Sequence, residues 1–320
     1  MTKNLKLFLT SILLSSVFCW GINLSQKNLE NLFYFEKIAK NPQILTAKLI
    51  SEGIKVLDED KEELPKEKKI IPEINTRSYI SVLIDQNGNE KILFEKESDK
   101  KLPIASLTKL MTALVVLEYP EYYSLEDSVR ISKEAIAQDE NFGGLMLGEK
   151  FSIEDLLYVM LIESSNDAAW AISEVVGINQ FVNLMNLQAD YNLGFKNSYF
   201  VNSTGLDPKD PKSQIGNYST AKDLAKLTKY LLKKSLIWEI LSKKEYDLWS
   251  EENIFHHLIN KNELLDLPEV LGGKTGYTDE ALGCFILVLK SDDNFIINVI
   301  LGSKDRFSDM KKMIETATKN

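Results

Sequence analysis

The sequence predicts an α+β domain in which one antiparallel sheet, built from both ends of the globular region, is flanked by a helical insert. Three observations predict this class. Alternating apolar residues and a turn at residues 78–94 indicate a β-hairpin. Apolar residues at helical spacing dominate residues 106–246. Strand patterns return at residues 270–301, and a single sheet that uses both strand regions and is covered by the helices explains this order.

The expected elements follow in chain order. Apolar residues alternate over 80–84, Asn87-Gly88 supplies the turn, and residues 91–94 return as the second strand. Helical stripes are expected at residues 107–115, 156–162, 181–185 and 221–232, the last one opened by the capping pair Ser219 and Thr220. Three strands and a closing helix are expected at residues 270–276, 282–289, 295–301 and 305–317, with a turn at 291–294.

The N-terminal region differs from this domain. Lys3 and Lys6 precede an uncharged, mostly apolar run over residues 7–26, which is typical of a secretory signal and also reaches the length of a membrane span. Residues 1–26 are therefore predicted as a signal peptide or an N-terminal membrane anchor, which places the rest of the chain outside the cytoplasm. Residues 27–77 are predicted as a charged linker, in part helical, and residues 78–320 as the globular domain.

Composition excludes some functions. With 44% hydrophobic and 27% charged residues among 320, the chain resembles ordinary globular proteins. Its net charge of −9 argues against a nucleic-acid-binding protein, which carries a basic patch. Neither an H-E-x-x-H nor a C-x-x-C arrangement occurs, so no zinc site is expected. His256 and His257, the only histidines, lie in a loop-like segment and are interpreted as solvated or capping residues.

A serine and a lysine at the start of the first helix form a candidate nucleophile and base. Ser106 and Lys109 stand at i and i+3, so the hydroxyl and the amine fall on one helix face. A lysine can act as a base when burial or a neighbouring cation favours its neutral form, and Lys274 is the candidate cation. On its own, the Ser106 pair also fits a helix cap followed by a solvated lysine.

Two further motifs carry polar groups suited to substrate binding. Ser164 and Asn166 stand at i and i+2, so they reach a common cleft only if a connection between helices holds them. Their segment also fits a simple helix cap. Lys274, Thr275 and Gly276 precede two apolar strands; on an edge strand, the amine and the hydroxyl would bind a carboxylate, and the glycine would leave room for a backbone. A glycine-rich turn is the alternative.

The three motifs together, S-x-x-K, S-x-N and K-T-G, are those of penicillin-binding proteins and class A β-lactamases. From residue 78 onward the chain resembles the serine-type D-alanyl-D-alanine carboxypeptidases, which are penicillin-binding proteins of low molecular mass. Other stretches share the resemblance: Leu83-Ile84-Asp85, Pro103-Ile104-Ala105, Asn166-Asp167-Ala168-Ala169, Asn202…Gly205-Leu206, Ser219-Thr220-Ala221 and Gly276-Tyr277-Thr278. The resemblance implies a β-lactamase/transpeptidase-like fold for residues 78–320.

The resemblance also implies residue roles. A peptidoglycan stem peptide would acylate Ser106 and release its terminal D-alanine, with Lys109 as the base and Ser164 as a proton relay. The resemblance makes Asn166 a partner of the substrate amide. Its other implied substrate-binding residues are Lys274 and Thr275 for the terminal carboxylate, Gly276 beside them, and the backbone N–H groups of Ser106 and Tyr277 for the oxyanion.

The resemblance implies a partner, an inhibitor class and a location as well. β-Lactams would acylate the same serine, and no metal or cofactor is implied. The site would lie outside the cytoplasm, on the outer face of the bacterial membrane or in the periplasm or cell wall.

Alternatives remain open at this stage. A D,D-endopeptidase that cleaves peptidoglycan cross-links would use the same residues. A class A β-lactamase needs a deacylating glutamate motif after the second element, and none is found between Asn166 and Lys274. An inactive wall-binding scaffold would not need Lys109. Two departures from the family are expected: Asn217 replaces a histidine often found before Tyr218, and a C-terminal β-rich domain with an amphipathic membrane helix is missing, so any anchor would be N-terminal.

Overall fold

A computed structural model describes residues 71–140, 142–208 and 216–319, all within the unit that spans Lys68–Asn320. The segment predicted as a signal peptide or anchor, residues 1–26, lies outside the described residues, as does the predicted linker up to residue 70. Within the described part of the chain, no helix is both long enough and apolar enough to cross a membrane.

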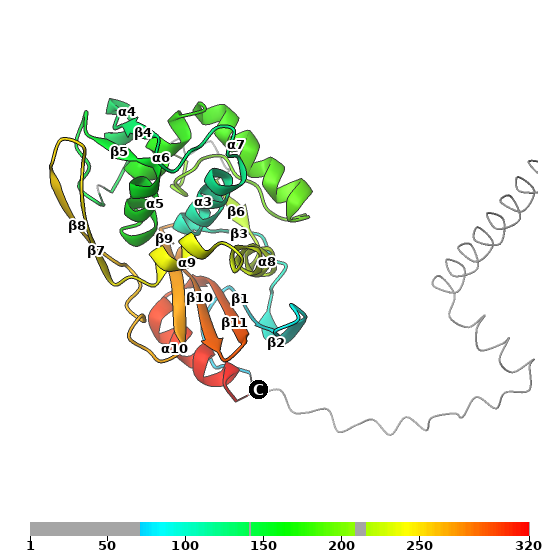
Figure 1. Ribbon diagram of the computed structural model, residues 1–320. Coiled ribbons are helices and arrows are strands. Elements are labelled where there is room, and N and C mark those ends of the chain that lie inside the picture. Colours follow the sequence, from blue (N-terminus) through cyan, green and yellow to red (C-terminus); the bar gives the residue numbers. More distant parts are fainter. Residues whose placement is uncertain (1–70, 141, 209–215, 320) are drawn as a thin grey trace, which may run out of the picture. The chain divides into compact units, whose positions relative to one another are not determined.

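One antiparallel sheet organises the domain, with the strand order β2-β1-β11-β10-β9 (Figure 1). β1 pairs with β11 in register from Ser78 opposite Leu301 to Ile84 opposite Phe295, so the first and the last strand meet inside the sheet. This arrangement confirms the predicted sheet from both ends of the domain. The strands are β1 (Ser78–Ile84), β2 (Glu90–Lys96), β9 (Val270–Thr278), β10 (Leu282–Ser291) and β11 (Asn294–Ser303).

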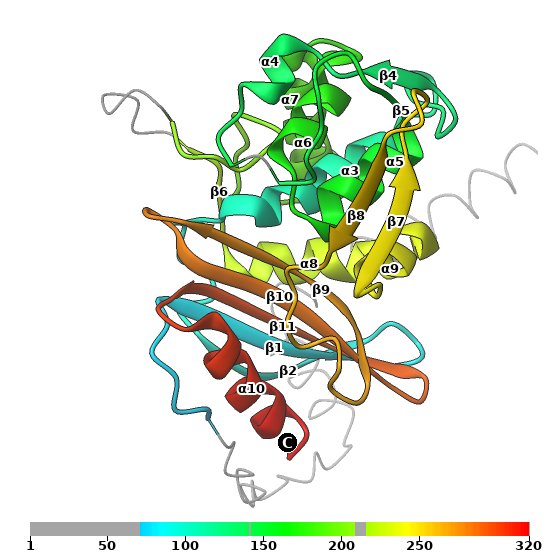
Figure 2. The same cartoon turned by 90° about the vertical axis from the view of Figure 1, so that its left-hand side faces the viewer.

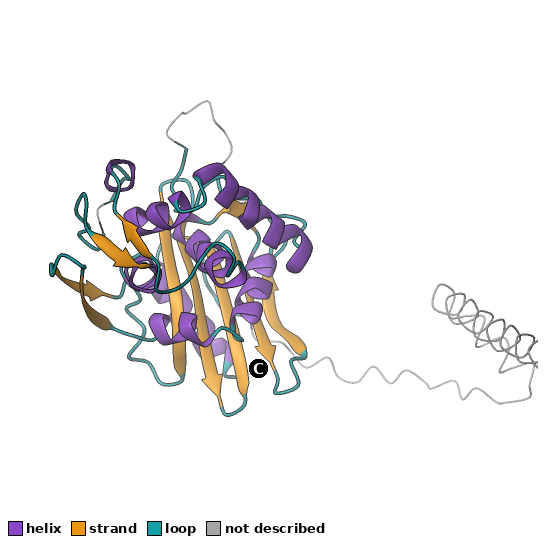
Figure 3. Cartoon of the chain, turned by 45° about the horizontal axis from the view of Figure 1, so that its top comes forward, coloured by secondary structure: helices purple, strands orange, loops and turns teal. Residues whose placement is uncertain are grey.

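Helices fill the interval between β2 and β9 and then close the chain (Figure 3). Each predicted helical stripe lies on a helix, which confirms the helical insert, and Thr220 caps α8 by accepting a hydrogen bond from Asp223 N at 3.0 Å. The helices are α3 (Thr108–Glu118), α4 (Lys133–Ile136), α5 (Ile153–Ile162), α6 (Asn166–Glu174), α7 (Ile178–Leu187), α8 (Ala221–Leu231), α9 (Ser235–Leu241) and α10 (Arg306–Ala317), with short helical turns η1 (Ala105–Leu107) and η2 (Gln188–Asn192).

The sheet is buried on both faces because its strands alternate between two hydrophobic clusters. Ile80, Val82 and Ile84 of β1 face the large cluster shared with the helical insert, whereas Tyr79 faces a smaller cluster with Met310 of α10. In Figure 2, α10 lies on one side of the sheet and α8 and α9 lie on the other. A sheet buried on both faces is a rigid support, and its edge strand β9 runs beside η1.

Three two-stranded sheets were not predicted. They pair β3 (Leu102–Pro103) with β6 (Tyr218–Ser219), β4 (Ser128–Arg130) with β5 (Lys150–Ser152), and β7 (Glu245–Trp249) with β8 (Phe255–Ile259). The interpretation of the two histidines was wrong about their segment, which is strand β8 and not a loop, and about His256, which is buried. His257 is exposed, in agreement with the interpretation.

Residues 71–77, at the end of the predicted linker, contact the domain. Lys96 Nζ donates a hydrogen bond to Thr76 O at 2.9 Å, and Ile74 packs against the cluster beneath α10. Arg77 N donates to Gly302 O at 3.3 Å, which continues the β1–β11 pairing by one residue.

Candidate active site

The candidate nucleophile lies on a strained turn that leads from β3 into α3. Ala105, the residue before Ser106, has φ = +47°, a left-handed value that non-glycine residues rarely adopt. Gly205 holds this turn from the other side, because a Cβ at that position would lie 2.1 Å from Ala105 O. Ser106 itself lies in η1 and lines a pocket, so its hydroxyl is reachable from outside.

Lys109 is fully buried, and its amine lies at hydrogen-bonding distance from three groups. Lys109 Nζ donates to Asn166 Oδ1 at 2.7 Å and to Thr204 O at 2.6 Å, and it lies 2.9 Å from Ser106 Oγ. A neutral amine has two N–H donors and one lone pair. The two carbonyl oxygens take the donors, so the lone pair is left for the Ser106 hydroxyl proton.

Electrostatics favours this neutral form. Burial lowers the pKa of Lys109 to about 7, against the opposing effect of the negative charge on Glu140. Burial also holds the pKa of Lys274 well below its usual range, and the positive charges of Lys109, Arg306 and Lys261 lower it further. Burial is the cause that lowers the pKa of Lys109, so the action of Lys274 on Lys109 as a neighbouring cation stays a prediction.

The second motif spans the connection between α5 and α6. Ser164 lies in this connection with φ = +64°, and Asn166 is the first residue of α6, so the chain bends between them and turns both side chains toward Lys109 and Lys274. Ser165 caps α6, since its hydroxyl accepts a hydrogen bond from Ala168 N at 3.2 Å. The cap and the two polar contacts therefore coexist in one segment.

The third motif lies on the edge strand β9. Lys274 Nζ donates to Ser164 Oγ at 2.8 Å and to Thr275 O at 3.0 Å, so the amine contacts the second motif, and its side chain is buried behind the pocket. Thr275 lines the pocket instead. Gly276 has no room for a side chain, because a Cβ there would lie 2.9 Å from Ser106 N. β9 and η1 are thus in close backbone contact beside the nucleophile.

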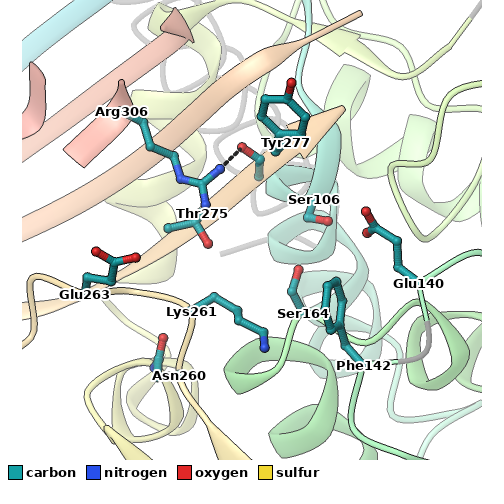
Figure 4. Close-up of a pocket in the computed structure, with 11 residues that line it drawn as sticks. Ser106, Glu140, Phe142, Ser164, Asn260, Lys261, Glu263, Thr275, Tyr277 and Arg306 are labelled. Carbon is teal, nitrogen blue, oxygen red and sulfur yellow. Dashed lines mark hydrogen bonds between the residues drawn. The ribbon is translucent and has the colours of Figure 1, made fainter. Parts of the chain in front are cut away.

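These residues surround a pocket of about 280 Å³ (Figure 4). Ser106 and Ser164 lie on one side of it and Thr275 lies on the other. Tyr277 contributes from the end of β9, with 52% of its surface exposed. The complete lining is Ser106, Glu140, Phe142, Ser164, Asn260, Lys261, Glu263, Thr275, Gly276, Tyr277 and Arg306.

Several lining residues escaped sequence reasoning. Arg306, from α10, donates from Nη1 to Gly276 O at 3.2 Å, and its buried Nε has no hydrogen-bond partner among the described residues. Lys261 lies 4.5 Å from the centre of the Phe142 ring and pairs with Glu163 at 2.8 Å. In Figure 4, Glu140 lies on the same side as Ser106, across the pocket from Glu263. Arg306 follows the third motif by thirty residues on a different element, and no short pattern connects it to that motif.

The donor set of the pocket consists of hydroxyls, amines, an amide and a guanidinium. Among the described residues, no group of three histidine, cysteine, aspartate or glutamate side chains is placed to hold a metal ion. What the arrangement offers is a hydroxyl beside a neutral amine, with further cations around it. Such a site is suited to nucleophilic attack on an acyl group that carries a nearby negative charge.

A family model described as D-alanyl-D-alanine carboxypeptidase matches residues 65–305. Among curated proteins, the chain is 34% identical over 245 residues to D-alanyl-D-alanine carboxypeptidase DacF of Bacillus subtilis, and the match covers 74% of this chain and 61% of DacF. It is 30% identical over 254 residues to a D-alanyl-D-alanine endopeptidase of Pseudomonas aeruginosa, covering 74% of this chain and 77% of that protein.

Solved structures of penicillin-binding proteins share the fold of this chain. The crystal structure of penicillin-binding protein D2 from Listeria monocytogenes, in the ampicillin-bound form, superposes with a TM-score of 0.63 at 30% identity. The match covers 77% of this chain and 98% of that one. The predicted penicillin-binding, transpeptidase-like fold is confirmed.

Proposed function

The chain belongs to the D-alanyl-D-alanine carboxypeptidase family, and on that premise we propose that it is a serine D,D-carboxypeptidase that removes the terminal D-alanine from peptidoglycan stem pentapeptides. The observation that carries the proposal is the buried amine of Lys109, which lies 2.9 Å from Ser106 Oγ with its two N–H donors occupied by carbonyl oxygens. This geometry supports the proposed role of the amine, which is to accept the serine proton.

In the first half-reaction, Ser106 Oγ attacks the carbonyl carbon of the penultimate D-alanine and its proton passes to Lys109 Nζ. The backbone N–H groups of Ser106 and Tyr277 are proposed to bind the oxyanion, and one such donor contributes roughly 3–4 kcal/mol. The C–N bond then breaks as the leaving amine takes the hydroxyl proton of Ser164, whose oxygen contacts Lys274 Nζ at 2.8 Å. Ser164 is reprotonated with the proton that Lys109 took from Ser106, so Lys109 is neutral again before the second half-reaction. The products are an ester on Ser106 and free D-alanine.

In the second half-reaction, a water molecule attacks the ester carbonyl and gives its proton to Lys109. The bond between Ser106 Oγ and the acyl carbon breaks, and the serine oxygen recovers a proton from Lys109. The net reaction consumes one water for each peptide bond cleaved, and the enzyme returns to its starting state.

Recognition of the substrate's terminal carboxylate is assigned to the β9 side of the pocket. The Thr275 hydroxyl lines this side, and Lys274 stands behind it. Arg306 joins them, because its guanidinium reaches the same wall with a buried Nε that has no hydrogen-bond partner among the described residues. Three positively charged or donor groups around one anion explain a preference for peptides with a free C-terminus. Asn166 is proposed to bind the substrate amide from the opposite wall.

Further partners follow from this proposal. β-Lactams, which mimic the acyl donor, are expected to acylate Ser106, and the ampicillin-bound state of the Listeria relative supports this expectation. The substrate is found outside the cytoplasm, so we propose that the domain acts there, with residues 1–26 as its export signal or membrane anchor.

The test incubates the full chain with a synthetic stem pentapeptide and with a cross-linked stem dimer, followed by mass spectrometry. We expect the pentapeptide to lose one alanine residue, and Ser106→Ala to abolish this loss. Ser98→Ala is the matched control: Ser98 and Lys101 share the same spacing, but Ser98 hydrogen-bonds Glu95 on the surface hairpin.

Other outcomes identify the alternatives. Cleavage of the dimer with an intact pentapeptide would make the protein an endopeptidase, like its Pseudomonas relative. Rapid hydrolysis of a chromogenic cephalosporin would indicate a β-lactamase. If neither peptide changes and fluorescent penicillin does not label Ser106, the proposal is wrong and a wall-binding scaffold remains.

A further inference from the structure

A buried glutamate–histidine pair lies outside the pocket and takes no part in the mechanism above. His256 on β8 and Glu149 just before β5 expose only 5% and 2% of their side chains. His256 Nε2 lies 2.9 Å from Glu149 Oε1, and His256 Nδ1 lies 3.1 Å from Gly143 O. Burying such a pair is costly unless its geometry is well satisfied, so its presence requires an explanation.

The contacts of this pair fix its protons. A backbone carbonyl only accepts, so His256 Nδ1 must carry a proton toward Gly143 O. The second oxygen of Glu149 accepts from Met146 N at 2.6 Å, and the first one faces His256 Nε2. Without a proton between them, two lone pairs would face each other in a buried site. A proton therefore lies between His256 Nε2 and Glu149 Oε1, and this hydrogen bond adds to the one that Nδ1 donates to Gly143 O.

The pair holds one segment of chain, Phe142–Glu149, which we call the pocket segment. This segment has no regular secondary structure, and its glycines at 143, 144 and 148 all have positive φ. Gly143 packs so closely on α5 that a Cβ there would lie 2.5 Å from Val159 Cγ1. His256 binds the segment near its start through Gly143 and at its end through Glu149. β8 thereby fixes both ends of an otherwise irregular segment.

The pocket segment begins at the candidate active site. The Phe142 ring lines the pocket, and the Lys261 amine lies over the face of this ring. Lys261 also pairs with Glu163, the residue before Ser164. On the other side of the segment's start, Asp139 O accepts a hydrogen bond from Asn166 Nδ2 at 2.7 Å. One residue from Gly143, therefore, the chain forms a wall of the pocket. Figure 2 shows the β7–β8 hairpin beside β5 and α5, from where it reaches the segment.

We propose that His256 is a positioning residue of the peptidase, acting through the pocket segment. Its ring, hydrogen-bonded to Glu149 and to Gly143 O, clamps Gly143 so that Phe142 keeps its place on the pocket wall against Lys261. His256 touches no reacting atom, so its contribution is to substrate binding. This inference rests on the proposed function for its kinetic readout, and its structural part stands independently of that function.

The first experiment tests the protons directly. The chain has two histidines, so His257→Gln in the full-length protein leaves a single imidazole, which ¹⁵N nuclear magnetic resonance can observe. We expect Nδ1 of His256 to bear a proton, as its hydrogen bond to Gly143 O requires. A bare Nδ1 would overturn the proposed clamp.

The second experiment compares His256→Gln with His257→Gln in steady-state cleavage of the stem pentapeptide. His257 is the matched control, since it is the next residue on the same strand and pairs with Asp247 on the exposed face. We expect His256→Gln to raise KM about tenfold while kcat changes less than threefold, and His257→Gln to change neither. Equal kinetics for the two variants would overturn the proposal.

A third variant and a second measurement distinguish loss of the clamp from unfolding of the protein and from failure of the proposed function. Glu149→Gln should raise KM to a similar extent, and the double variant should be no worse than either single one, because both substitutions break the same contact. Hydrogen exchange of residues 142–149 should be faster in His256→Gln than in His257→Gln, even if the pentapeptide is not a substrate. Unchanged exchange in a folded His256→Gln protein would refute the clamp, whereas faster exchange without peptidase activity would refute only the proposed function.

Discussion

At the scale of single residues, the burial of Lys109 determines its chemistry. Its amine makes three polar contacts in a fully buried position, and the desolvation that lowers its pKa to about 7 is the same feature that makes it a base near neutral pH. The three partners of this amine come from η1, α6 and the stretch before Gly205. The protonation state of one side chain therefore depends on three separate parts of the fold.

The first prediction concerns the pH dependence of acylation. Below pH 7 the fraction of neutral Lys109 falls tenfold per pH unit, so the second-order rate of β-lactam acylation should fall with it and level off above pH 7. Lys109→Arg keeps its charge and should acylate about 10²–10⁴-fold more slowly at every pH. Stopped-flow measurements from pH 5 to 9 provide the profile. A rate that is independent of pH over this range would rule out Lys109 as the base.

At the same scale, motif spacing identifies polar residues that are close in sequence, but not those that reach the site from elsewhere. Ser106 and Lys109 were predictable because helical geometry fixes i and i+3. Arg306, Lys261 and Phe142 were not, since each reaches the pocket through tertiary packing. The contact of Lys274 with Ser164, which joins the second and third motifs, was not predictable from motif spacing either.

At the scale of elements, the junction between β9 and η1 determines how the nucleophile is presented. Gly276 on β9 faces the backbone of Ser106, with Ala105 Cβ and Ile104 O also within 3.3 Å of where its Cβ would be. Neighbouring backbone cannot move as a flexible side chain can, so even one methyl group must separate the strand from the turn.

The second prediction follows from this contact. Gly276→Ala should slow acylation of Ser106 at least about a hundredfold, since displacement of the nucleophile by even 1 Å is costly to reactivity. The matched control is Val270→Ala, which lies at the other end of β9 and should acylate at the native rate. Labelling with fluorescent penicillin measures both variants, and thermal unfolding reports whether they fold. Native labelling of Gly276→Ala would show that the junction is not rigid.

Asp167, at the start of α6, has a buried carboxyl group that affects the stability of the fold. Both oxygens of Asp167 lack a hydrogen-bond partner among the described residues, and burial raises its pKa to about 6. The native state thus binds more protons than the unfolded state between about pH 4 and pH 6, and stability falls as the pH rises through this interval.

The third prediction is that Asp167→Asn relieves this loss. The variant should be more stable than the native chain at pH 8, by up to about 3 kcal/mol, and the advantage should disappear at pH 4, where the native carboxyl is protonated. Urea unfolding at the two pH values measures the difference. The exposed Asp190→Asn serves as the control and should show no such pH-dependent gain.

At the scale of the whole described domain, the buried amines make stability depend on pH. Lys109 loses its proton near pH 7 in the native state, whereas an unfolded lysine keeps it to about pH 10.4. Between these values the unfolded chain binds more protons, so the free energy of unfolding increases with pH. Lys274, whose pKa is also lowered, acts in the same direction.

The fourth prediction uses Lys109→Met to isolate this effect. The native chain should gain stability relative to the variant by up to about 1.4 kcal/mol per pH unit between pH 7.5 and 9.5. Urea unfolding of both proteins at several pH values gives the slope. A constant difference between them would mean that Lys109 keeps its proton in the folded protein.

The architecture could be predicted well because its strands and helices are long and strongly apolar. The strands from 270 to 301 and the hairpin at Asn87-Gly88 had unambiguous patterns, and the structure confirms them. β4 and β5 have three residues each, too few to show a period. On β8 a histidine occupies an inward-facing position, so the alternation that marks a strand was interrupted by a residue that pairs with a distant glutamate.

The pairing of β1 with β11 has a consequence for biosynthesis. Ser81 hydrogen-bonds Asn298 across 217 positions of the chain, and β1 has no other neighbour on that side. At a ribosomal speed of roughly 5–20 residues per second, β1 waits about 10–40 s for its partner to be made. Throughout that interval its apolar edge is open to wrong pairings.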